Sequence, residues 1–160
     1  SNTHGVEQMP RIKLLEHQEY TFHHNIKVRI TDVNQALHVG TIELTGILHD
    51  TRVNLFRQLN MNEIDLGDGR TGMVISDMAI NFKNEAFLFD EITVDSAIGE
   101  IWEYGFRLLH RVRRDDALIA LAEIGAITFD HGKKTKAGVP ETLIQALATH
   151  NSRQHALNAV

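Results

Sequence analysis

The side chains best suited to chemistry gather in one short polar turn. Asp32, Asn34 and His38 follow a segment that alternates like a β-strand and precede the longest helical pattern in the chain. An imidazole, with its pKa near neutrality, can act as general acid or general base, and a carboxylate can act as a base. An asparagine can orient a water molecule through hydrogen bonds. The turn is therefore the first candidate for an active site.

The same turn leads into the start of the predicted helix. Backbone N–H groups there have no partner within the helix, and the helix dipole is positive at that end. The amides of Val39, Gly40 and Thr41 are therefore predicted to bind substrate by donating to an oxyanion, and Gly40 allows close approach. Purely structural roles explain the polar side chains equally well, namely turn formation, helix capping and a histidine bonded to a carbonyl group.

The helical pattern over residues 41–60 predicts a core element. Its apolar side chains form a stripe broad enough to imply that most of the helix surface is buried. These residues are Ile42, Leu44, Ile47, Leu48, Val53, Leu55, Phe56 and Leu59. Gly46, in the middle of the pattern, costs about 1 kcal/mol relative to alanine unless a strand must approach the backbone closely there.

Two further candidates lie within this predicted helix. His49 and Asp50 are adjacent, so they point in different directions and only one is expected to face a cleft. We assign Asp50 as a catalytic candidate and His49 as a substrate-binding candidate, with a salt bridge to Arg52 as the structural alternative for Asp50. The histidines form none of the spacings typical of metal sites, so no metal is predicted.

The remaining segments predict one antiparallel sheet. Each alternates between apolar and polar residues, and helices between the strands, which a parallel doubly wound sheet needs, are missing. The economical arrangement is an α+β fold with a long curved sheet wrapped around one central helix. We expect an N-terminal arm over residues 1–19 and one domain over 20–160. One helix cannot cover the whole sheet, so dimerisation is expected. The predicted strands cover 20–31, 71–83, 89–100, 101–113 and 117–130, and a short C-terminal helix covers 140–149.

Composition excludes several classes of partner. The net charge of −5 argues against nucleic acid, because phosphate binding needs a basic face. The absence of cysteine excludes disulfides and a thiolate nucleophile, and fits the reducing cytoplasm, where we expect the protein. No run approaches the roughly 18 apolar residues that span a membrane.

Motif and element order together resemble the hot-dog-fold thioesterases, in the branch that contains 4-hydroxybenzoyl-CoA thioesterase and related acyl-CoA thioester hydrolases. That branch carries Asp-x-Asp-x-x-x-His-Val-Asn-Asn after the first strand and aromatic-Glu-x-Ala-Arg within the helix. The resemblance covers about residues 20–140 and implies hydrolysis of acyl thioesters of CoA or acyl carrier protein. CoA or phosphopantetheine would then be part of the substrate and not a cofactor. The resemblance also implies that the protein is a homodimer or a dimer of dimers. The matching positions are Asp32, Asn34, His38, Val39, Gly40 and Thr41, then residues 48–52.

One departure from the family pattern concerns the chemistry directly. The second aspartate of the family turn is the catalytic carboxylate, and Asn34 stands in its place. An amide is neither a nucleophile nor a base, so His38 or Asp32 would have to activate water while Asn34 positions it. The family's helix glutamate is likewise replaced, by His49.

Two alternatives stay open. In the first, the same fold binds an acyl thioester or another apolar ligand without turnover, which Asn34 favours. In the second, the protein is an enoyl hydratase or dehydratase with the motif Asp-x-Asn-Pro-x-His. Residues 32–34 begin that motif, but Gln35 replaces its proline and His38 comes one residue too late.

Overall fold

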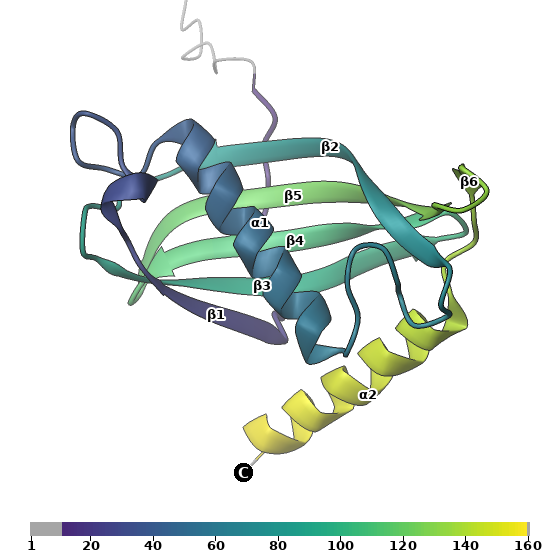
Figure 1. The fold of residues 1–160 in the computed structure, drawn as a ribbon. Coiled ribbons are helices and arrows are strands. Elements are labelled where there is room, and N and C mark those ends of the chain that lie inside the picture. Colours follow the sequence, from purple (N-terminus) through teal and green to yellow (C-terminus); the bar gives the residue numbers. More distant parts are fainter. Residues whose placement is uncertain (1–10, 160) are drawn as a thin grey trace, which may run out of the picture.

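The computed structural model describes residues 11–159. A curved antiparallel sheet wraps around α1, with the strand order β1-β3-β4-β5-β2 and a short β6 paired with β5 (Figure 1). The elements are β1 (Phe22–Lys27), a 3-10 turn η1 (Ile30–Asp32), α1 (Thr41–Gln58), β2 (Thr71–Phe82), β3 (Glu91–Trp102), β4 (Gly105–Arg114), β5 (Ala117–Asp130), β6 (Thr135–Lys136) and α2 (Glu141–Asn158).

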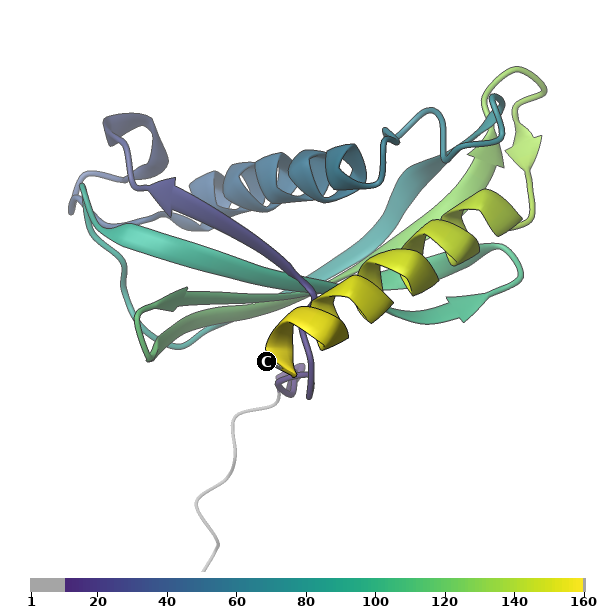
Figure 2. The same ribbon diagram turned by 90° about the horizontal axis from the view of Figure 1, so that it is seen from below.

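The core lies between α1 and the concave face of the sheet (Figure 2). Leu44, Leu48 and Phe56 of α1 are buried against inward-facing side chains such as Phe106 of β4. The expectation that most of the α1 surface is buried is wrong for this chain, because Ile42 is 80% exposed. Apolar residues recur on α1 beyond the stripe that the sheet covers, so the helix buries one broad face and leaves the other open.

Two boundaries differ from the sequence prediction. The hairpin between β3 and β4 turns at residues 103–104, so Trp102 and Tyr104 are exposed and do not share the buried face of β4. The C-terminal helix begins near the predicted residue but continues to Asn158. It is long because it packs on the sheet: Leu143 and Leu147 enter the core.

The described part of the N-terminal arm lies against the outer face of the sheet. The Leu14 amide donates to Asn81 Oδ1 of β2 (2.7 Å), and Glu16 pairs with Arg111 of β4 (3.2 Å). The Arg111 guanidinium lies over the Tyr20 ring, 4.6 Å from its centroid. The first ten residues of the predicted arm lie outside the described range.

A buried carboxylate joins three strands beneath this arm. Asp95 of β3 accepts hydrogen bonds from His23 of β1 (2.7 Å) and from Arg111 and Arg113 of β4 (2.9 and 2.7 Å). Burial alone would raise the pKa of Asp95, but the hydrogen bonds, that from Arg113 foremost, outweigh it and lower the pKa below its ordinary value.

His110 is the counterpart on the inner face. It is fully buried beneath α1, where Ser96 Oγ lies 2.6 Å from Nδ1. Burial disfavours the imidazolium, and the nearby Arg52 guanidinium repels it, so the pKa of His110 falls to about 3.

Within the described residues, neither helix is long and apolar enough to cross a membrane.

We predict that His110 makes folding stability depend on pH. As pH falls below about 6.5, the unfolded chain takes up a proton at His110, but the folded protein resists protonation until about pH 3. This contribution to the free energy of unfolding is therefore complete above pH 6.5 and is lost toward pH 3, by up to about 1.4 kcal/mol per pH unit. The free energy of unfolding, measured with urea at several pH values between 4 and 7, should change less steeply with pH for His110→Gln than for wild type.

The matched control is His131→Gln, which changes an exposed histidine in the loop after β5. Its free energy of unfolding should depend on pH as steeply as that of the wild type. An equally steep pH dependence in wild type and His110→Gln would contradict the role assigned to His110.

Candidate functional site

The polar turn is held in place by a backbone network. The backbone N–H of Asn34 donates to the backbone carbonyl of His38 (2.9 Å), which closes the turn. Within the turn, Leu37 adopts a left-handed φ of 61°. The Leu88 amide then donates to Leu37 O (3.0 Å), so the turn packs against the segment between β2 and β3. Residues distant in sequence thereby reach His38.

The surroundings of His38 favour one tautomer of the neutral imidazole. Asn34 Oδ1 accepts from the Ala36 amide (3.0 Å), which orients the side-chain amide so that Nδ2 faces His38 Nδ1 at 3.5 Å. Glu85 Oε1 lies 3.9 Å from Nε2 on the opposite side of the ring, and the Phe87 ring meets the imidazole edge-on. A donor at Nδ1 and a carboxylate near Nε2 both favour the tautomer with its proton on Nε2. Nδ1 therefore carries the lone pair of a base.

The three predicted oxyanion donors differ in availability. The Val39 amide already donates to Ala86 O (2.8 Å), so in this conformation it is not free for a substrate. Within residues 11–159, the amides of Gly40 and Thr41 have no hydrogen-bond partner at the start of α1. A side chain at position 40 would collide with the carboxylate of Glu43, which explains the glycine.

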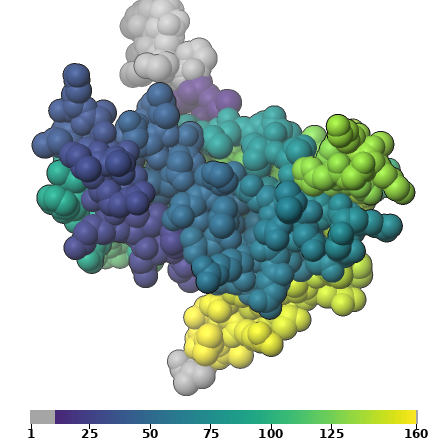
Figure 3. Space-filling view, in the orientation of Figure 1, coloured from purple at the N-terminus to yellow at the C-terminus, as the bar shows by residue number. Residues whose placement is uncertain are grey.

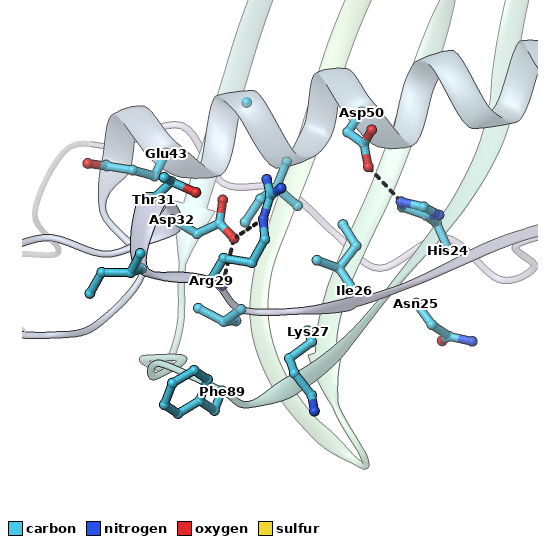
Figure 4. A pocket seen from close by; sticks show the side chains of 14 residues that line it. His24, Asn25, Ile26, Lys27, Arg29, Thr31, Asp32, Glu43, Asp50 and Phe89 are labelled. Atoms are coloured by element: carbon cyan, nitrogen blue, oxygen red, sulfur yellow. Dashed lines mark hydrogen bonds and ion pairs between the residues drawn. The ribbon is translucent and has the colours of Figure 1, made fainter.

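A cavity of about 950 Å³ lies between β1 and the N-terminal half of α1 (Figure 4). Glu43 and Asp50 project from one face of α1, with Gly46 between them. The opposite wall is the chain from residue 24 to 32, and Phe89 lies at the rim. The surface view shows α1 lying open over much of its length (Figure 3).

Two of the predicted catalytic residues line this cavity. Asp32 Oδ2 accepts from the Arg29 amide (2.8 Å) and from Arg29 Nε (3.4 Å), so the buried carboxylate stabilises the 3-10 turn, the structural role considered for it. Asp50 lies farther along α1, where His24 Nε2 is 2.8 Å from its Oδ2. Neither is bonded to His38 or Asn34, so the four catalytic candidates form two separate groups.

His49 lies on another side of α1. Its Nε2 is 3.7 Å from Glu63, in the loop between α1 and β2, and Glu63 also accepts from Arg52 Nε. The expected alternative of an Asp50–Arg52 salt bridge is therefore wrong, because Arg52 pairs with Glu63 and Asp50 with His24. No group of three or more potential metal ligands occurs within the described residues.

Three residues near the candidate site were not predicted from the sequence: Glu85 and Phe87, which lie beside His38, and His24, which lines the cavity. Glu85 and Phe87 come from the segment between β2 and β3, and their sequence carries no signal for contact with His38. His24 is different, because its inward position was visible in the alternation of the first strand. What the alternation does not show is that Asp50 of α1 lies opposite.

Comparisons with known proteins were made for both sequence and structure. The sequence model of the thioesterase-like superfamily matches residues 28–147. Curated protein sequences gave no significant match. A 1,4-dihydroxy-2-naphthoyl-CoA thioesterase from Synechocystis has a similar structure, with a TM-score of 0.71 and 18% identity over 79% of this chain and 95% of that one.

Two further solved structures are similar. A protein from Staphylococcus aureus, determined in complex with CoA, gives a TM-score of 0.73 at 15% identity and covers 81% of this chain and 82% of that one. A probable thioesterase from Escherichia coli gives 0.65 at 18% identity and covers 78% and 95%. At such identities the likeness shows a shared fold.

Proposed function

The chain belongs to the thioesterase-like superfamily, and we propose from that premise that it hydrolyses acyl thioesters of CoA or of a carrier protein. The sheet order, the central helix and the similar structures confirm the predicted hot-dog fold. The observation that supports the proposed reaction is the orientation of the His38 imidazole between Asn34 and Glu85, in the turn that leads into α1. At the start of that helix the Gly40 and Thr41 amides have no partner among residues 11–159.

Hydrolysis would proceed as follows. The thioester carbonyl oxygen accepts hydrogen bonds from the Gly40 and Thr41 amides, where the helix dipole also favours negative charge. His38 Nδ1 removes a proton from a water molecule, whose oxygen attacks the carbonyl carbon. Collapse of the tetrahedral intermediate breaks the carbon–sulfur bond, and the imidazolium returns its proton to the leaving thiolate. The Glu85 carboxylate stabilises the imidazolium. The water replaces Asn34 Nδ2 at the Nδ1 lone pair, where the Asn34 contact is long at 3.5 Å.

Asp32 is the weaker candidate for the base. Its carboxylate is buried, and Oδ2 is bonded to the Arg29 backbone and side chain. We therefore assign Asp32 to the support of the turn and His38 to proton transfer.

We predict that release of free thiol from acyl-CoA substrates depends on His38. His38→Ala should lower kcat/KM by at least about a hundredfold, the usual contribution of a general base. Glu85→Gln should cause a smaller loss, because it removes only the charge that stabilises the imidazolium. A panel of short, long and aromatic acyl-CoAs and an acyl carrier protein thioester would also identify the carrier. His131→Ala is the control, and equal activity of His38→Ala and wild type would refute the mechanism.

We also propose a homodimer that forms along the free edge of β2. Within the described chain β2 pairs only with β5. Met78 and Phe82 of β2 are exposed, as is Val53 on α1, which leaves apolar surface beside this edge. Sedimentation should therefore give at least twice the chain mass of 18.1 kDa, and a monomer at micromolar concentration would argue against this assembly. The cytoplasmic location stays a prediction.

Asn34 favours a second candidate function, the binding of an acyl thioester without turnover. Under this alternative the wild type releases no thiol, and Asn34→Asp, which restores the family carboxylate, should give thiol release at least about tenfold above the rate without enzyme. Under the proposed mechanism the wild type is active, and the substitution changes kcat by less than this. The double variant Asn34→Asp/His38→Ala shows whether any new activity still needs the imidazole.

A further inference from the structure

The cavity between β1 and α1 leads away from the proposed reaction centre. One end is lined by Asp32 and Glu43, and the Glu43 carboxylate lies against Gly40 at the helix start. The other end is formed by His24 and Asp50 (Figure 4). Asp50 follows Thr41 by nine residues, so the helical rise places it roughly 13 Å along α1. The cavity therefore begins beside the helix start, where Glu43 lies against Gly40, and has the length to hold a chain of about ten carbons.

Gly46 indicates that the cavity itself has a function. A glycine in mid-helix destabilises the helix, and proteins usually keep one where a neighbour packs too closely for a side chain. Here a Cβ atom at position 46 would meet nothing within 4 Å, so no close approach of a strand offsets the cost of this glycine. The glycine instead keeps the cavity open. The buried Ile47 and Val28 line its middle, and the charged Arg29 side chain lines the cavity as well.

The far end of the cavity is polar. His24 Nε2 is bonded to Asp50 Oδ2, and within residues 11–159 the other carboxylate oxygen of Asp50 has no hydrogen-bond partner. The Asp50 side chain is 61% exposed, so a ligand can reach this oxygen. An ionised carboxylate only accepts hydrogen bonds, so it selects a donor group and repels an anion.

We propose that this cavity holds the acyl chain of the substrate and selects a medium-length chain with a hydroxyl group at its far end. The proposal rests on the proposed thioesterase function. The thioester lies at the Gly40 and Thr41 amides, the methylene chain passes Gly46 and Ile47, and the terminal hydroxyl donates to Asp50. A chain that ends in a methyl group leaves Asp50 without that donor, and one that ends in a carboxylate is repelled.

The first measurement compares kcat/KM for ω-hydroxydecanoyl-CoA, decanoyl-CoA and ω-carboxynonanoyl-CoA. Because water already hydrogen-bonds an exposed carboxylate, the hydroxylated substrate should be better than decanoyl-CoA by about two- to fivefold, and the carboxylated one should be the poorest. Asp50→Leu should abolish or reverse this preference. A wild type that favours decanoyl-CoA over the hydroxylated substrate would overturn the choice of a polar terminus.

The second measurement fills the cavity. Gly46→Leu should lower kcat/KM for both ten-carbon neutral substrates at least tenfold more than for acetyl-CoA, because the leucine occupies the path of the chain. Gln58→Leu places the same side chain at an exposed position of α1 outside the cavity and should leave the ratio unchanged. If Gly46→Leu does not fold, Gly46→Ala adds a single methyl group to the open space and should cause a smaller change in the same direction.

Calorimetric binding of the thioether S-(ω-hydroxydecyl)-CoA separates this inference from the proposed function, because the thioether cannot be hydrolysed. Binding that is lost in Gly46→Leu, in a protein that hydrolyses no thioester, would sustain the cavity and refute the thioesterase. Hydrolysis whose chain preference is unchanged in Gly46→Leu and Asp50→Leu would sustain the thioesterase and refute the cavity. Failure of the wild type to bind the thioether would also refute the proposal that the cavity holds the acyl chain.

Discussion

Packing of α1 into the concave face of the sheet is the constraint on which the rest of this structure depends. Leu44, Leu48, Leu55 and Phe56 are almost fully buried there, and burial of such side chains is the largest favourable term in folding. Because α1 is fixed along its length, its first turn is fixed too. The polar turn before it therefore presents Gly40 and Thr41 amides at a defined place.

A helix that buries one face leaves two flanks, and this division separates the polar residues of α1. His49 turns toward Glu63, on the flank that also carries the exposed Val53. Asp50 and Glu43 turn toward β1 and line the cavity. Neighbouring residues in sequence thus serve different surroundings, because each step along the helix rotates the side chain by about 100°. The proposed reaction centre lies at the helix start.

In the proposed mechanism the turn holds an oriented base, His38, although Asn34 stands where the resemblance places a catalytic carboxylate. Asn34 cannot take a proton, yet its amide, fixed by Ala36, faces His38 Nδ1. Glu85 supplies negative charge from a different segment and lies near Nε2. A carboxylate that acts through an imidazole can stand at a distance from the reacting atoms, which a carboxylate acting alone cannot.

The sequence by itself determined the α+β class, the extent of α1, four of the long strands and the polar turn, because these depend on local periodicity and turn chemistry. It placed the β3–β4 hairpin too early, since the apolar Trp102 and Tyr104 continue the alternation without being buried. The tertiary structure alone decided the partners: Glu85 for His38, His24 for Asp50, and Arg29 rather than substrate for Asp32. Such pairs join segments whose distance is set by the curvature of the sheet and the packing of α1, and no local pattern encodes that distance.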